Sequence, residues 1–130
     1  MPSSLIEVRR SYTQDQQVAL IDAVHGALVA AFKIPQEDRF IRILSYEPHA
    51  MVNSLAAGVA DDYTRVTVDC FAGRSIEAKR RFYTEIVERL EKLGIARGNV
   101  SILLRESPPE NWGAGGIAAC DYDLGFNINV

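Results

Sequence analysis

Pro2 is the residue whose chemical type and position bear most directly on catalysis. An initiator methionine is readily removed when proline follows it, and loss of Met1 would leave Pro2 as a secondary amine with no other reactive group. An ordinary α-amino group has a pKa of roughly 7.7–8.0, and apolar surroundings or nearby arginines would lower the pKa of the more basic proline amine. Pro2 is therefore a candidate general base, general acid or iminium-forming nucleophile near neutral pH.

The charge balance restricts the partners of such an amine. The chain has 130 residues, 48% of them hydrophobic, and its 14 Lys and Arg against 17 Asp and Glu give a net charge of −3. A weakly acidic globular chain lacks the basic surface that holds nucleic acid or an anionic membrane, so we expect neither as a partner. An anionic ligand would instead need single, well-placed arginines.

The cysteines and histidines do not form a metal-binding pattern. Cys70, Cys120, His25 and His49 are spaced too widely for a zinc site, and residues 113–116 are too irregular for a phosphate-binding loop. We therefore predict no metal and no organic cofactor. The chain has no apolar run of about 18 residues and no signal-peptide pattern, and its unpaired thiols favour a cytoplasmic location.

The first third of the chain predicts a strand, a helix and a second strand. Residues 3–8 predict the first strand, and Thr13 with Gln16 forms a capping box that begins a helix. One stripe of that helix recurs every three or four positions, at Val18, Ile21, Val24, His25, Leu28 and Phe32. The helix must end before Pro35, and residues 41–44 predict the next strand.

The same order recurs later in the chain. Residues 65–71 alternate and predict a strand. Ser75 is the expected N-cap of a second helix that ends at Gly94, and residues 100–104 predict another strand. Residues 47–62 between the halves carry no clear period, which indicates a long connection with room for a hairpin arm.

The last part of the chain gives weaker signals. Residues 107–110 predict a short helical turn, residues 113–116 a flexible loop, and residues 122–130 a terminal strand.

Together these elements predict one α+β domain with two pseudo-repeat halves, at about residues 1–46 and 64–106, and a C-terminal extension over 107–130. A strand–helix–strand connection is right-handed with parallel strands. The two βαβ halves would therefore form one four-stranded, mainly parallel sheet with both helices on one face. The other face would stay bare, with Val, Ile and Leu on it, so we expect an oligomer.

The chain as a whole resembles the tautomerase superfamily, and within it malonate semialdehyde decarboxylase most closely. The likeness runs from Pro2 to about Trp112. It is carried by Pro2, Asp-Ala-Val-His-Gly-Ala at 22–27, Ala31-Phe32, Pro-Gln-Glu-Asp-Arg at 35–39, Arg74-Ser75, Phe82-Tyr83, Glu106 and Trp112. The resemblance implies the β-α-β fold of that superfamily, a homotrimer, and a cofactor-free enzyme that acts on a small carboxylate substrate.

The resemblance also implies roles for four residues. Pro2 matches the catalytic proline, and Asp38 matches an aspartate beside it that assists a water or the substrate carbonyl. Arg74 matches a carboxylate-binding arginine, and its place at a helix start, where a cation is unfavourable, favours a functional role. Trp112 matches an aromatic pocket wall. From the residues alone, Asp38 is equally a turn or N-cap residue after Pro35. Trp112 is alternatively a core or interface residue, which does not exclude a place on the pocket wall.

Two positions depart from the decarboxylase pattern. The decarboxylase has Arg-x-Arg where this chain has Ala-Gly-Arg at 72–74, and an aromatic residue where this chain has Ala114. Arg9, Arg10 and Arg39 are candidates to supply the missing cation.

Three other residues stand near these motifs. Tyr122 and Phe126 of the terminal extension are further candidates to line the site. We interpret His25 as a packed or hydrogen-bonded helix residue rather than as a catalyst.

The protonation state of Pro2 separates two activities. A cationic Pro2 would polarise the carbonyl of a 3-oxo acid, which leads to C–C cleavage, with hydration as a related activity. A neutral Pro2 would move a proton between oxygen and carbon, which is keto–enol tautomerisation of an enol-pyruvate-type substrate. A non-enzymatic oligomeric binding protein on the same scaffold is the second alternative.

Overall fold

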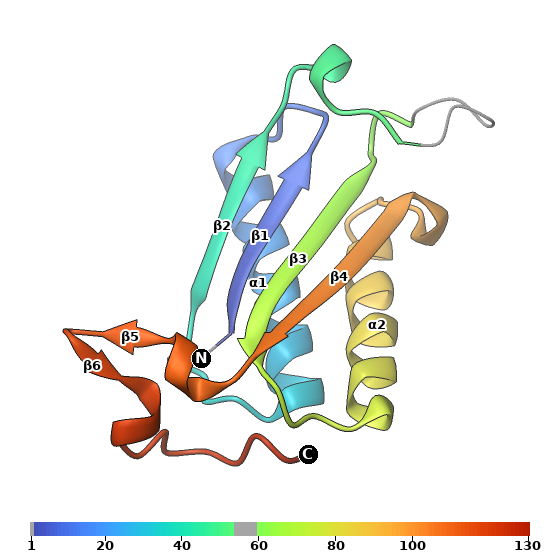
Figure 1. The fold of residues 1–130 in the computed structure, drawn as a ribbon. Helices are drawn as coiled ribbons and strands as arrows, with labels where there is room; N and C mark the ends of the chain where they lie inside the picture. The colour runs from blue at the N-terminus through green and yellow to red at the C-terminus, as the bar shows by residue number, and fades with distance from the viewer. Residues whose placement is uncertain (1, 54–59) are drawn as a thin grey trace.

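The chain forms two βαβ units that share one sheet (Figure 1). The structure is a computed structural model, which describes residues 2–53 and 60–130. The first unit consists of β1 (Ser3–Val8), α1 (Gln14–Phe32) and β2 (Phe40–Ser45). The second consists of β3 (Thr64–Phe71), α2 (Ile76–Glu91) and β4 (Val100–Ser107).

Both helices begin at the predicted caps. The Thr13 hydroxyl accepts a hydrogen bond from the Gln16 amide, and the Gln16 side chain accepts one from the Thr13 amide, so the capping box is present. The Ser75 hydroxyl accepts a bond from the Ala78 amide at the start of α2. Gly94 follows α2 with a φ of 87°, which closes the helix. None of the helices in the described residues is long and apolar enough to cross a membrane.

The strand order in the sheet is β2-β1-β3-β4. β1 pairs in parallel with β2, and β3 in parallel with β4, whereas β1 and β3 are antiparallel. Figure 1 shows α1 and α2 side by side behind the sheet. The predicted fold class, a mainly parallel four-stranded sheet with two helices on one face, is therefore confirmed.

The core fills the space between the sheet and the helices. Alternate strand residues face the helices and are fully buried, among them Ile6, Val8, Val66 and Val68. Helix residues cover them, namely Leu20, Val24, Leu28 and Phe32 of α1 and Phe82, Ile86 and Leu90 of α2. Burial of one such side chain contributes about 1.5–3 kcal/mol. The core therefore holds the sheet in place, and the sheet in turn positions the polar residues at its two ends.

The uncovered face of the sheet is more polar than the sequence predicts. Its apolar residues are Leu and Phe rather than Val and Ile, namely Leu5, Phe40, Leu44 and Leu103. Charged residues share the face, namely Glu7, Arg42, Arg65, Asp69 and Arg105. The expectation of Leu on this face is right and that of Val and Ile is wrong, because the two-residue period of each strand turns its Val and Ile toward the helices.

The C-terminal extension forms a hairpin and an irregular tail. β5 (Gly113–Ala114) pairs with β6 (Ile117–Ala118) across two glycines with φ of 59° and 81°, as a two-residue hairpin requires. The predicted strand over 122–130 is absent. The tail instead runs along the lower end of the sheet to α2 (Figure 1), where the Ser75 amide donates to the Val130 carbonyl at 2.8 Å.

The connection between the two halves contains a 3-10 turn at Pro48–Ala50. The hairpin arm expected within 47–62 falls partly on residues 54–59, which lie outside the described residues.

Candidate active site

Pro2 lies in a pocket at one end of the sheet. It is buried just before β1, and a pocket of about 240 Å³ opens beside it. The walls come from the starts of β1 and β2 and from the segment after β4, through Ser3, Phe40, Trp112, Gly113 and Ala114. Figure 1 shows the N-terminus at the lower end of β1, close to that segment. Pro2 and Trp112, far apart in sequence, thus share one pocket.

Asp38 reaches the same end of the sheet because of the strand register. Ser3 pairs with Phe40 in the parallel β1–β2 ladder. Pro2 precedes Ser3 by one residue and Asp38 precedes Phe40 by two, so both lie at this end of the sheet. Asp38 is half-buried on a turn, in which its amide donates to the Pro35 carbonyl at 3.1 Å. The fold therefore places Asp38 at the same end of the sheet as Pro2, and Asp38 is not among the residues that line the pocket.

Arg74 is buried and incompletely bonded. Its side-chain Nη1 donates to the Phe71 carbonyl at 3.0 Å, and its guanidinium lies 4.9 Å from the centroid of the Phe32 ring. Nε and Nη2 are buried without a hydrogen-bond partner. Burial lowers the pKa of Arg74, and Cys70 and Glu106 oppose that shift. Because arginine stays cationic at neutral pH, two donors of a buried cation are available for an anion.

Phe71 connects Arg74 with the pocket wall. Its ring meets the Trp112 ring edge-on, with centroids 5.2 Å apart, and its carbonyl accepts the Arg74 bond. The Trp112 Nε1 donates to the Ser107 hydroxyl at 2.8 Å, which fixes the orientation of the indole. Phe71 therefore links the two residues, through its carbonyl to Arg74 and through its ring to Trp112, and Arg74 itself is not on the pocket wall.

The three further candidates lie outside this pocket in the described structure. Arg39 is exposed and forms an ion pair with Asp22 of α1. Tyr122 is half-buried, with its hydroxyl buried and unpartnered. Phe126 packs against the core. Their roles at the site remain predictions.

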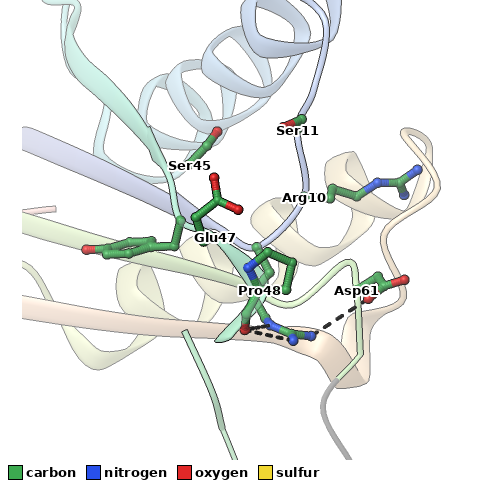
Figure 2. Close-up of a pocket in the computed structure, with 8 residues that line it drawn as sticks. Arg10, Ser11, Ser45, Glu47, Pro48 and Asp61 are labelled. Carbon is green, nitrogen blue, oxygen red and sulfur yellow. Dashed lines mark hydrogen bonds and ion pairs between the residues drawn. The ribbon is translucent and has the colours of Figure 1, made fainter. Parts of the chain in front are cut away.

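Arg9 and Arg10 lie at the opposite end of the sheet, after β1. They line a second pocket of about 310 Å³, shown in Figure 2. Arg9 Nε and Nη2 donate to the Pro48 carbonyl at 3.2 and 2.9 Å, and Nη1 donates to the Ala60 carbonyl at 3.0 Å. Within one chain the length of β1 separates both arginines from Pro2, so neither supplies the second cation there.

Two aromatic residues of the site were not identified from the sequence. Phe40 lines the pocket as the first residue of β2, and parallel pairing of the first two predicted strands was the signal that placed it there. Phe71 is the last residue of β3, three residues before Arg74, and its contact with Trp112 has no local signal.

Pro2 is buried at the start of a duplicated βαβ sheet, the fold that the resemblance to the tautomerase superfamily implies. A family model described as "Tautomerase enzyme" matches residues 38–115, and the chain belongs to that family. A curated relative, the probable tautomerase YrdN of Bacillus subtilis (strain 168), is 27% identical over 118 residues, which cover 88% of this chain and 92% of YrdN.

Two solved structures are similar along most of the chain. FG41 malonate semialdehyde decarboxylase inhibited by 3-bromopropiolate superposes with a TM-score of 0.82 and 31% identity, covering 90% of this chain and 92% of that one. A second malonate semialdehyde decarboxylase, solved in wild-type, mutant and inactivated forms, gives 0.81 and 30%, covering 90% and 93%. A symmetric trimer of Q0 fused 4-OT shares the fold, with a TM-score of 0.77 and 24% identity, covering 90% and 95%.

Proposed function

We propose that this chain catalyses decarboxylation or hydration of a small oxo acid, using the Pro2 amine and no cofactor, as a malonate-semialdehyde-decarboxylase-like enzyme. The observation that carries the proposal is the pocket that Pro2 shares with Trp112. The identity of about one third with two such decarboxylases, along nine tenths of the chain, supports the substrate class. Removal of Met1 is a requirement of the proposal, because only a free Pro2 nitrogen is basic.

Arg74 would hold the substrate carboxylate. Its two unpartnered nitrogens, Nε and Nη2, form the planar pair of donors that matches two carboxylate oxygens. A bound anion would satisfy both donors and compensate the buried charge. Phe71 and Trp112 would then exclude water from the carbonyl end of the substrate.

In the decarboxylation step, a cationic Pro2 polarises the 3-oxo carbonyl. The bond between the carboxylate carbon and its neighbour breaks, its electron pair moves toward the carbonyl, and Pro2 transfers its proton to the carbonyl oxygen, which yields carbon dioxide and an enol. The enol then takes up a proton from solvent at carbon and returns its hydroxyl proton to Pro2, which yields the aldehyde and the cationic amine. Asp38 orients the carbonyl, or in the hydration reaction a water molecule.

Keto–enol tautomerisation is the second candidate function. The match to the tautomerase family and to YrdN favours it. It requires a neutral Pro2 amine that transfers a proton, and it depends less on Asp38. The relative activity toward the two substrate types therefore indicates which protonation state the enzyme uses.

Asp38→Asn tests the assignment because it keeps the size of the side chain and removes its charge. We expect decarboxylation of a malonate semialdehyde or oxaloacetate-type substrate to fall by roughly 10²–10⁴-fold, and tautomerisation of an enol-pyruvate to fall less. Both substrates are assayed side by side on purified enzyme. A wild-type preference for the enol-pyruvate with little loss in Asp38→Asn would favour the tautomerase, equal loss on both substrates would contradict the role given to Asp38, and no activity in the wild-type enzyme on either would favour a binding protein.

We also propose a cytoplasmic homotrimer in which the uncovered sheet faces meet around a three-fold axis. Leu5 and Leu103 at the centre of that face supply apolar contact area, and the surrounding charges supply complementary pairs. The trimeric state of Q0 fused 4-OT supports this arrangement. Sedimentation of a stable 14.4 kDa monomer would contradict it.

A further inference from the structure

The turn that carries Asp38 is bonded to helix α1 on both sides of the aspartate. On one side, Nε2 of His25 lies 2.8 Å from the Gln36 carbonyl oxygen. On the other side, Arg39 forms an ion pair with Asp22. Asp22 and His25 are three residues apart on α1, so they lie on the same face of the helix, one turn apart.

The two anchors differ in burial. His25 is 3% exposed, whereas the Arg39 and Asp22 side chains are 44% and 56% exposed. A carbonyl oxygen only accepts, so Nε2 of His25 carries the hydrogen, and Nδ1 is buried without a partner. Because exposed ion pairs contribute little, the buried His25 bond is the anchor that determines where the turn lies.

The turn is stiff between its anchor and the aspartate. The Asp38 amide donates to the Pro35 carbonyl at 3.1 Å, and the Arg39 amide donates to the Glu37 carbonyl at 3.0 Å. Pro35 restricts the backbone further. A displacement of Gln36 is therefore transmitted to Asp38, two residues later.

We propose that His25 is a positioning residue of the reaction, which acts through Asp38 by holding the Gln36 carbonyl. The inference rests on the proposed function of Asp38. A catalytic group displaced by about 1 Å costs on the order of 10²-fold in rate. The histidine thus contributes to catalysis without touching the substrate, from a position that faces the core side of α1.

Two substitutions at position 25 test this role. His25→Leu removes the donor and places an apolar side chain in the buried position, whereas His25→Gln keeps an N–H donor. We expect His25→Leu to lower kcat for decarboxylation by about 10- to 100-fold with little change in KM, and His25→Gln to recover part of the loss. Val24→Ala is the matched control, since it creates a cavity on the same buried helix and should lower Tm while kcat stays unchanged.

A double-mutant cycle separates the positioning role from general destabilisation. If His25 acts through Asp38, the kcat of His25→Leu/Asp38→Asn equals that of Asp38→Asn alone. Multiplication of the two losses would overturn the inference and leave the proposed function of Asp38 intact. Full activity of Asp38→Asn would instead overturn that proposed function, and the inference with it.

Nitrogen-15 NMR of the wild-type enzyme tests the bond without any variant. We expect the His25 ring to carry its hydrogen on Nε2, the tautomer that the Gln36 bond requires. A ring with its hydrogen on Nδ1 would overturn the proposal, whether or not the variants fold.

Discussion

Arg9 is half-buried at one end of the sheet and Arg74 is buried at the other, and the two arginines differ in how completely they are bonded. Arg9 directs three nitrogens at the backbone carbonyls of Pro48 and Ala60, which ties two segments of the long connection to the end of β1. Arg74 makes one such bond, to Phe71, and leaves two buried nitrogens without a partner.

This difference separates a structural arginine from one suited to a ligand. Leaving donors of a buried cation unpaired costs free energy, and a fold tolerates that cost where a ligand completes the site. The surroundings of the two side chains also differ. Glu47 and Asp61 line the pocket beside Arg9 (Figure 2), whereas the guanidinium of Arg74 lies against the Phe32 ring, with Glu106 close enough to oppose the lowering of its pKa.

The largest expected loss of activity follows from blocking the Pro2 amine. An extra residue before Pro2, or a retained Met1, turns the amine into an amide with no basic lone pair. We expect activity to fall by roughly 10²–10⁴-fold or more while Tm stays within a few degrees. Intact-mass measurement establishes which N-terminus is present, and the kinetics are measured on the same sample. Full activity of the blocked enzyme would refute the mechanism, and with it the functional meaning of the unpaired Arg74.

The second prediction exchanges the two arginines for methionine. Arg74→Met should lower kcat/KM by about 10- to 150-fold, with stability changed by no more than about 1 kcal/mol because an unpaired buried charge is removed. Arg9→Met should instead lower the free energy of unfolding by about 2–4 kcal/mol, because three bonds to carbonyls are lost. Urea unfolding and steady-state kinetics of both variants provide the comparison, and loss of stability in Arg74→Met comparable to that in Arg9→Met would break it.

The smallest expected effect concerns the two thiols. Cys70 lies in the core, and Cys120 lies in the C-terminal extension. Burial raises the pKa of Cys70, and partial desolvation with the carboxylates of Asp121 and Glu110 raises that of Cys120. A raised pKa lowers the thiolate fraction at neutral pH, so labelling by iodoacetamide should be slow at pH 7 and faster at pH 9. Mass spectrometry should find the exposed Cys120 labelled in the native protein and Cys70 only after unfolding. Rapid labelling of native Cys70 would show that the core opens.

The fold was predictable because its signals are local. The Thr13 cap, the stripe of α1 and the alternation of β3 each specify an element from neighbouring residues, and right-handed connections then fix each βαβ unit. The antiparallel pairing of β1 with β3 joins residues far apart in the sequence and had no such signal. The hairpin over 113–118 also had a local signal, since consecutive glycines supply two positive φ angles. The flexible loop predicted over 113–116 is instead β5 and the turn of this hairpin.

The tail and part of the site were less predictable. Residues 122–130 do not form a strand because short polar side chains bond their own backbone: Asp123 accepts from the Gly125 amide, and Asn127 accepts from the Asn129 amide. The ion pair of Arg39 with Asp22 joins residues 17 positions apart. No sequence period indicates which of several arginines turns toward a helix and which toward a pocket.

The antiparallel seam between β1 and β3 relates the two halves of the chain by an approximate two-fold rotation. Ser3 lies opposite Asp69 and Val8 opposite Thr64, so β3 begins at the end of the sheet away from Pro2. At that end, Tyr63 immediately precedes β3, as Pro2 immediately precedes β1.

A mid-chain nitrogen such as that of Tyr63 is part of a peptide bond and is never a free base. Each chain therefore has two βαβ units but only one proline nitrogen that can become a free amine. Active-site titration with a covalent reagent should count one reactive amine per chain, however many copies assemble.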